Sequence, residues 1–185
     1  MNANYYKVLL KISKIKYGEN LNLQGCPVIY NKRGSSIKIG NNVTIKSSFL
    51  SNLVGLYSRS IIVTRTPEAK IEIGDNVGIS GATIYARSSI TIGNNTMIGG
   101  NAKILDNDFH PIEINARNAD IKEKIKTRPI YIGENCFIGC NTLILKGTEL
   151  GDGCVVGAGA VVSGKFPPNS VIVGNPGKTM KIIQQ

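Results

Sequence analysis

Large aliphatic residues recur at every sixth position of this chain, and small or polar residues fill most of the positions between them. An α-helix has an apolar period of about 3.6 residues and a half-buried strand a period of about 2, so neither element explains a regular period of six. The period predicts a hexapeptide-repeat solenoid, in which each hexad forms one short strand and one tight turn. The frame is uninterrupted over Ile132, Ile138, Ile144, Leu150, Val156 and Val162.

Three such hexads would complete one coil of a three-sided prism, so that residues 18 positions apart lie above one another. Neighbouring strands would then be separated by about 4.8 Å. Branched aliphatic side chains pack well on a buried pleated surface, and glycine at the corners allows backbone angles that other residues adopt only with strain. We therefore predict an all-β protein built as a parallel β-helix. The predicted core stacks are Ile132/Leu150, Ile138/Val156 and Ile144/Val162.

The same frame returns earlier in the chain with interruptions. Residues 17–21 and 39–43 belong to a first block, and a second block runs from residue 73 to Ile104 with a slip of one residue before Ile92. Between the two blocks, at about residues 46–70, the frame is lost. This loss predicts an irregular or flatter stretch in that part of the solenoid.

The two ends of the chain lie outside the repeat. Residues 3–16 carry apolar residues at helical spacing with lysines between them, which fits either a short amphipathic helix or an edge strand. We expect an N-terminal basic segment at residues 1–16, a β-helix over residues 17–175 and a C-terminal tail at residues 176–185. The β-helix would carry a protruding loop at residues 105–130.

The length of 185 residues fits a single domain, and the formal net charge of +10 indicates an anionic partner or a solvated lysine-rich surface. Phosphorylated small molecules or an anionic membrane surface would both use such charge, although membrane contact is not required. Nucleic acid is not expected, because few aromatic residues are interleaved and no recognition motif is present. No apolar run approaches the ~18 residues that span a bilayer, and a signal-peptide core is missing, so we expect a cytoplasmic protein.

The four cysteines indicate neither a metal site nor a disulfide framework. Cys136 and Cys154 are 18 residues apart, so the repeat stacks them on adjacent coils as small residues in one column. Zinc ligation would need four converging ligands at short paired spacings. We expect reduced thiols and no bound metal.

The candidate chemistry lies where the hexads stop, between Ile104 and Ile130. Insertions in a solenoid commonly form a binding face. His110, the only histidine of the chain, lies at the root of this insertion, where the frame would next place a core aliphatic residue. Its position alone leaves two interpretations open, a residue held for chemistry and a surface histidine without a role.

Two segments resemble a known family. They are Gly-Asn-Asn-Thr-Met-Ile-Gly-Gly-Asn-Ala-Lys-Ile-Leu-Asp-Asn-Asp-Phe-His-Pro, at residues 93–111, and Pro-Pro-Asn-Ser-Val-Ile-Val-Gly-Asn-Pro-Gly-Lys, at residues 167–178. Together with the hexads between them they resemble the hexapeptide-repeat acyltransferases, and within these the maltose and galactoside acetyltransferase group and bacterial polysaccharide O-acetyltransferases. The resemblance covers roughly residues 71–181. It implies a left-handed β-helix, against the usual right-handed crossover rule, and a homotrimer with acetyl-CoA between neighbouring prisms.

The resemblance also implies roles for residues of the loop. His110 would act as general base, taking the proton of a sugar hydroxyl group that attacks the thioester and later returning it to the CoA sulfur. Asp106, Asp108 and Glu113 are candidates to orient the imidazole or bind the sugar, although any one of them could be a solvated loop carboxylate. Many relatives carry an asparagine on the preceding coil that contacts the acceptor, and here Ser80 lies in the matching stretch.

Cofactor contacts follow from the same resemblance. An aromatic residue and small residues would line the pantetheine arm, a pair near the end of the prism would contact the cofactor, and two lysines would bind the CoA phosphates. In chain order these residues are Phe137, Cys140, Ala158, Ser163, Gly164, Lys178 and Lys181. The repeat itself favours small residues at Cys140, Ala158 and Gly164, whereas it has no need of Lys178.

Three other functions remain open at this point. The first is an N-acetyltransferase that acts on a nucleotide-linked aminosugar, which would use the same base and cofactor. The second is an antibiotic acetyltransferase, and the third is a non-catalytic trimeric binding module or scaffold. A carbonic-anhydrase-like member of the fold is excluded, because its metal needs three histidine ligands and this chain has one histidine.

Overall fold

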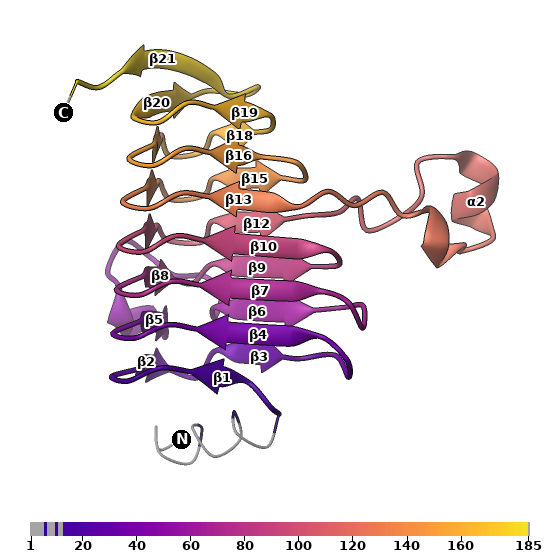
Figure 1. The fold of residues 1–185 in the computed structure, drawn as a ribbon, viewed down its shortest axis with the longest axis horizontal. Coiled ribbons are helices and arrows are strands. Elements are labelled where there is room, and N and C mark those ends of the chain that lie inside the picture. The colour runs from indigo at the N-terminus through magenta and orange to yellow at the C-terminus, as the bar shows by residue number, and fades with distance from the viewer. Residues whose placement is uncertain (1–5, 7–9, 11–12, 185) are drawn as a thin grey trace.

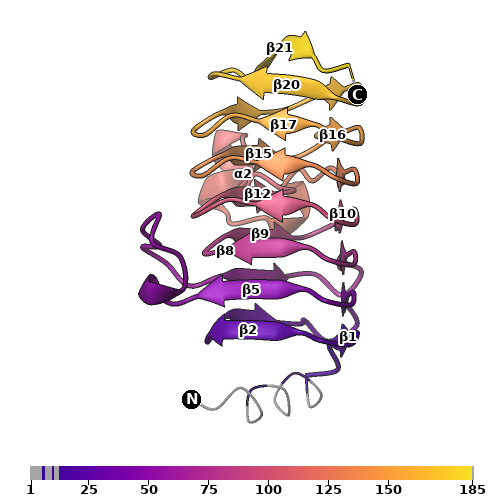
Figure 2. The same ribbon diagram turned by 90° about the vertical axis from the view of Figure 1, so that its left-hand side faces the viewer.

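The computed structural model describes residues 6, 10 and 13–184 and shows short strands stacked into a three-sided solenoid (Figures 1 and 2). Successive strands pass through three sheets, here called A, B and C, and neighbouring strands of a sheet run parallel except at the C-terminal end. The coils wind in a left-handed sense from the N-terminus to the C-terminus. The predicted all-β fold, a left-handed parallel β-helix, is confirmed.

Each sheet collects every third strand of the chain, and the last strand, β21, adds to sheet B next to β20. Sheet A consists of β1 (Lys16–Tyr17), β4 (Ser36–Ile39), β7 (Lys70–Ile73), β10 (Ser89–Ile92), β13 (Ile130–Ile132), β16 (Glu149–Leu150) and β19 (Lys165–Phe166). Sheet B consists of β2 (Asn22–Gly25), β5 (Thr44–Ser47), β8 (Gly78–Ser80), β11 (Met97–Ile98), β14 (Phe137–Ile138), β17 (Val155–Val156), β20 (Ser170–Val173) and β21 (Lys178–Ile182). Sheet C consists of β3 (Val28–Tyr30), β6 (Ile61–Thr64), β9 (Thr83–Ala86), β12 (Lys103–Leu105), β15 (Leu143–Leu145) and β18 (Val161–Val162).

The core is a set of aliphatic columns inside the prism. The three predicted stacks are confirmed, because each pair is in register on adjacent parallel strands and is buried. Burial of one such side chain stabilises the fold by about 1.5–3 kcal/mol, so each coil depends on its inward residues. On sheet B, one column of buried aliphatic residues is Ile45, Ile79, Ile98, Ile138, Val156 and Ile172.

Asparagine, rather than glycine alone, supplies the left-handed backbone at the corner between sheets A and B. Asn42, Asn76 and Asn95 have φ of 56°, 58° and 57°. Their side chains also bond along the stack, with Asn42 Nδ2 donating to Asn76 Oδ1 (3.1 Å) and Asn76 Nδ2 to Asn95 Oδ1 (3.0 Å). Corner glycines were expected for their backbone freedom, but the φ of Gly133 is not left-handed. A Cβ at this position would lie 2.4 Å from Asp152 Oδ1. Its missing side chain lets two coils approach each other.

The irregular stretch is shorter than the sequence indicated. It is limited to residues 48–60, which contain the 3₁₀ turn η1 (Phe49–Ser51), because β6 regains its place between β3 and β9 in sheet C. The helix or edge strand considered for residues 3–16 falls largely outside the described residues. Within it, Leu10 is buried and the Tyr6 hydroxyl group donates to the Pro27 carbonyl oxygen.

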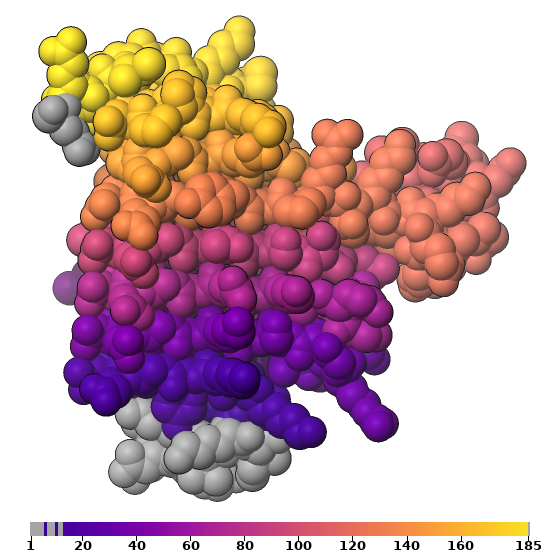
Figure 3. Space-filling view, viewed as in Figure 1, coloured from indigo at the N-terminus to yellow at the C-terminus, as the bar shows by residue number. Residues whose placement is uncertain are grey.

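An arm and a terminal strand complete the molecule. Residues 106–129 leave the solenoid between β12 and β13 and carry α2 (Ile114–Asn118) and the 3₁₀ turn η2 (Lys122–Lys124), which project sideways in Figures 1 and 3. The expected C-terminal tail contains β21, which pairs antiparallel with β20. Among the helices of the described residues, none has the length and apolarity that crossing a membrane requires.

Candidate active site

His110 lies at the root of the arm, at the corner between sheets C and A. The two chain segments of this root are hydrogen-bonded to each other: the Arg128 N–H donates to the Asp106 carbonyl oxygen (2.9 Å), and the Asp108 N–H donates to the Lys126 carbonyl oxygen (3.1 Å). An isolated antiparallel bridge between Asn107 and Thr127 lies between these bonds. His110 follows directly and is exposed, so a braced backbone carries an accessible imidazole.

Asp106 is a buried anchor of this root. Its carboxylate accepts from the N–H groups of Arg87 (2.8 Å) and Ser88 (2.6 Å) and from Asn107 Nδ2 (3.0 Å). Burial raises the pKa of Asp106 above its ordinary value, while the hydrogen bonds from Arg87, Ser88 and Asn107 oppose that rise. The residue is fully buried, so the carboxylate expected to orient the imidazole or contact an acceptor does not face solvent in this chain. Its oxygens tie the arm to the preceding coil instead.

Asn107 and Phe109 set the direction in which His110 leaves the root. The Asn107 side-chain oxygen accepts from the Phe109 N–H (2.9 Å), and Phe109 has a φ of 63°. The Phe109 ring lies 4.9 Å from the Tyr85 ring, centroid to centroid, and the His110 N–H donates to the Asp108 carbonyl oxygen (2.7 Å). Asn107 was not singled out in the sequence, although asparagine two residues before a strained position is a usual turn signal.

Asp108 pairs with Lys146, a residue of the next coil that no sequence pattern indicated. The Lys146 ammonium group binds Asp108 Oδ1, and the two side chains are 28% and 21% exposed. Asp108 Oδ2 is buried and has no hydrogen-bond partner among the described residues. The carboxylate next to His110 therefore keeps one free acceptor atom.

The expected cofactor contacts fall into three places. Phe137 is half exposed on β14 of sheet B, and Cys140 and Ala158 lie in successive turns between sheets B and C. Ser163 and Gly164 form the turn from β18 to β19, at the corner between sheets C and A. The remaining two, Lys178 and Lys181, are exposed on β21.

One chain does not bring these groups together. His110 and Asp108 share the corner between sheets C and A with Ser163 and Gly164, whereas the other expected contacts lie on sheet B or at its corner with sheet C. Ser80, the expected acceptor contact, is at the end of β8 in sheet B, where its hydroxyl oxygen accepts from Asn52 Nδ2 (3.1 Å). The histidine and the Ser80 side of the molecule thus lie at different corners of the prism.

The loop of residues 48–60 covers the corner between sheets B and C. The Tyr57 hydroxyl group donates to Asn141 Oδ1 (3.0 Å), and Asn101 binds both the Tyr57 N–H and the Gly55 carbonyl oxygen. Within the loop, Leu56 is buried, while Leu53 is 86% exposed. The loop therefore lies beside the turn that contains Cys140.

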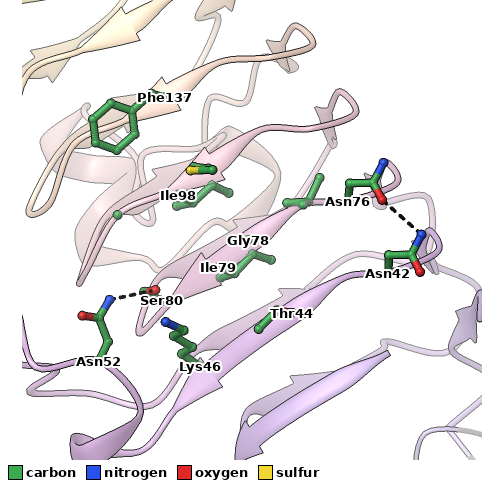
Figure 4. A pocket seen from close by; sticks show the side chains of 13 residues that line it. Asn42, Thr44, Lys46, Asn52, Asn76, Gly78, Ile79, Ser80, Ile98 and Phe137 are labelled. Carbon is green, nitrogen blue, oxygen red and sulfur yellow. Dashed lines mark hydrogen bonds between the residues drawn. The ribbon is translucent and has the colours of Figure 1, made fainter. Parts of the chain in front are cut away.

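A hollow of about 350 Å³ opens on the outer face of sheet B (Figure 4). Its floor crosses β5, β8 and β11, and Phe137 lies at its upper edge. Asn52 and Ser80 lie at one end of it, and Asn42 and Asn76 at the other. The hollow thus combines an apolar floor and an aromatic ring with hydrogen-bonding groups at both ends.

Comparison with known sequences identifies relatives of the chain. The sequence model of a family described as "Hexapeptide repeat of succinyl-transferase" matches residues 89–114 and 129–163. A Schizosaccharomyces pombe protein named as a candidate acetyltransferase is 42% identical over 95 residues, which are 51% of this chain and 44% of that protein. The candidate lipopolysaccharide-biosynthesis O-acetyltransferase WbbJ of Escherichia coli K12 is 30% identical over 158 residues, 82% of this chain and 74% of WbbJ. The chain spans less than half the length of the first curated relatives that it matches.

Solved structures with the same fold extend the comparison. A maltose O-acetyltransferase from Clostridium difficile 630 has 26% sequence identity and a TM-score of 0.58, with 100% of this chain and 80% of that chain covered. AntD, an N-acyltransferase from Bacillus cereus in complex with dTDP and 3-hydroxybutyryl-CoA, has 22% identity and a TM-score of 0.70 over 96% of this chain and 88% of that chain. At that level of identity the likeness to AntD concerns the fold alone.

Proposed function

The chain belongs to the hexapeptide-repeat acetyltransferase family, and from this premise we propose that it transfers the acetyl group of acetyl-CoA to a hydroxyl group of a sugar or cell-surface polysaccharide precursor. One observation carries the proposal: the only histidine of the chain is exposed at the end of a hydrogen-bonded root, where the repeat would otherwise continue. The similarity to WbbJ over most of both chains supports the acceptor class.

His110 is the general base of the proposed reaction. Its neutral imidazole removes the proton from the acceptor hydroxyl group as that oxygen bonds to the thioester carbonyl carbon. The carbon–sulfur bond then breaks, and His110 returns the proton to the departing sulfur, so no covalent enzyme intermediate is needed. Acetyl-CoA supplies the activated acetyl group. Asp108 Oδ2, a buried atom without a hydrogen-bond partner among the described residues, is proposed to orient the imidazole when the acceptor is bound.

Residues of sheet B and of its corner fit the donor. Phe137 offers an exposed aromatic surface, Cys140 and Ala158 leave space in successive turns, and the ammonium groups of Lys178 and Lys181 are free to meet phosphates. AntD, which has the same fold, is solved in complex with an acyl-CoA, and this supports an acyl-CoA as the donor. We propose a cytoplasmic location. CoA-dependent activity and the free thiols of Cys26 and Cys140 both agree with it.

A homotrimer would complete the site. Each chain carries His110 at one corner and Phe137, Cys140 and Ala158 around another, so a complete constellation needs two copies. A cyclic assembly repeats one head-to-tail contact and joins the histidine of each copy to the cofactor contacts of the next. We therefore propose three shared sites in a trimer.

The experiment that tests the proposal begins with calorimetric titration of the protein with acetyl-CoA. We expect saturable binding. Lys178→Ala should weaken it, because the substitution removes a cation that is proposed to bind the CoA phosphates. If no binding is detected at millimolar acetyl-CoA, the result contradicts the enzyme proposal and favours a trimeric scaffold.

The second step measures the proposed base. His110→Ala should lower acetyl transfer by about 10²–10⁴-fold, because the variant lacks the positioned base that removes the proton of the acceptor hydroxyl group. Acetyl-CoA affinity should not change, and Asn115→Ala, an exposed substitution on α2, serves as the matched control. Unchanged transfer by His110→Ala would refute the base assignment while leaving the donor assignment intact.

A further inference from the structure

The hollow on sheet B exists because one strand position lacks a side chain. Thr44, Gly78, Met97 and Phe137 are aligned across β5, β8, β11 and β14 and all face outward. Gly78 leaves a gap in this column between Thr44 and Met97.

The fold itself does not require glycine at this position. The φ of Gly78 is outside the left-handed region, and an added Cβ would meet no atom within 4 Å. Gly133 differs, since a Cβ there would collide with the next coil. A strand position in a buried or half-buried sheet normally favours a larger side chain, and glycine weakens the strand. The fold therefore does not account for glycine at position 78, and we ascribe it to a need for open space above the strand.

The lining of the hollow has the chemistry of a site for a charged sugar. Carboxamide and hydroxyl groups at its two ends can bind sugar hydroxyl groups, and Phe137 and Met97 offer apolar surface to a sugar ring. Lys46 is the single charged residue of the lining, and it makes no ion pair with any residue in the described part of the chain. A free ammonium group at the wall of a small cavity attracts a carboxylate or phosphate group.

We propose that this hollow binds the acceptor and that the acceptor is an anionic saccharide, whose carboxylate or phosphate group is bound by Lys46. The inference rests on the proposed function and names its substrate class. Phe137 lines both the hollow and the proposed donor groove, so an acceptor in the hollow lies next to the thioester. The lining holds no carboxylate that could bind the ammonium group of an aminosugar, and Lys46 would repel it. The site therefore favours transfer to a hydroxyl group over transfer to an amine.

The test uses ligand-observed saturation-transfer NMR on the full chain with three probes: glucose 1-phosphate, glucuronate and glucose. We expect at least one anionic probe to bind about tenfold more tightly than glucose, the difference of one charge-assisted hydrogen bond. Tighter binding of glucose 1-phosphate identifies a phosphate-bearing acceptor, and tighter binding of glucuronate a carboxylate-bearing one. Equal binding of the three probes, or no binding of any, overturns the inference.

Two variants locate the binding. Lys46→Ala should remove the preference for the anionic probe, and Gly78→Leu should abolish binding by filling the hollow without loss of thermal stability. Thr91→Leu, a partly exposed strand substitution on sheet A, is the matched control and should bind as the wild type does. Wild-type binding by Gly78→Leu would place the sugar elsewhere and refute the inference.

Acetyl-CoA titration, together with an acetyl-transfer assay on the three probes, separates this inference from the proposed function. If acetyl-CoA binds and neutral glucose is acetylated as fast as the anionic probes, the function stands and the anionic acceptor is wrong. If the anionic probes bind through Lys46 while acetyl-CoA does not bind, the sugar site stands and acetyl transfer is wrong.

Discussion

At the residue scale, the geometry of His110 depends on neighbouring side chains at the root of the arm. The Asn107 amide holds Phe109 in its left-handed conformation, and Phe109 packs on Tyr85, so the backbone before His110 has one direction. Asp106 ties the same root to the preceding coil. Polar groups buried at the root of a projecting arm are thus used to aim the residue that follows them.

This arrangement predicts a separation of catalytic from binding effects. Asn107→Ala should lower kcat by about tenfold, because a modest misplacement of a general base is costly, and should leave KM for acetyl-CoA unchanged. Asn107→Ser, which can make a weaker turn of the same kind, should recover part of the rate. Steady-state kinetics of both variants provides the measurement, and equal changes in kcat and KM would indicate a general loss of structure instead.

At the element scale, the corners are as constrained as the core. The corner between sheets A and B repeats a left-handed residue in coil after coil, and asparagine both tolerates that conformation and bonds to the asparagines above and below it. A short strand of two to four residues can stack on its neighbours only if the chain makes the same turn at that corner in each coil. Corner residues and core aliphatics therefore stabilise the same repeat.

A corner substitution tests this point. Asn95→Val places a branched side chain at φ 57° and removes the bond from Asn76, so we expect a loss of about 2 kcal/mol. Asn95→Gly keeps the conformation accessible and loses only the side-chain bond, so its effect should be smaller. Thermal unfolding followed by circular dichroism should rank wild type first, Asn95→Gly second and Asn95→Val last. A valine variant as stable as the glycine variant would contradict the role of the left-handed corner.

At the scale of the whole molecule, the proposed site is divided between two corners of the prism. His110 projects with the arm between sheets C and A, and Ala158 and Cys140 lie at the corner between sheets B and C. Both halves belong to every chain, so a head-to-tail contact between identical copies would form complete sites and close into a ring.

Mixed assembly provides the measurement. His110→Ala and Ala158→Trp chains should each be inactive alone, and unfolding and refolding them together in equal amounts should restore about a quarter of the wild-type rate, because a quarter of the shared sites would be intact. Light scattering of each variant alone is the control for assembly. An inactive mixture that assembles normally would assign both groups to a site within one chain, and a monomeric mass at micromolar concentration would contradict the trimer.

The sequence by itself determined the repeat and therefore the fold. A period of six is a local signal, and each hexad buries the same column, so the stacks and the position of the arm could be predicted without knowledge of contacts. His110 stood out for the same reason, because it lies where the frame breaks.

Only the tertiary structure decided the contacts between residues far apart in the chain. Asp108 meets Lys146, 38 positions away, and Tyr57 meets Asn141, 84 positions away, because insertions shift the coils relative to one another by lengths that the period does not encode. Burial of Asp106 and the hollow above Gly78 have the same origin, since they depend on which side chains neighbouring coils bring to one face. Periodicity determines which residues point inward, whereas the stacking of unequal coils determines what meets at the surface.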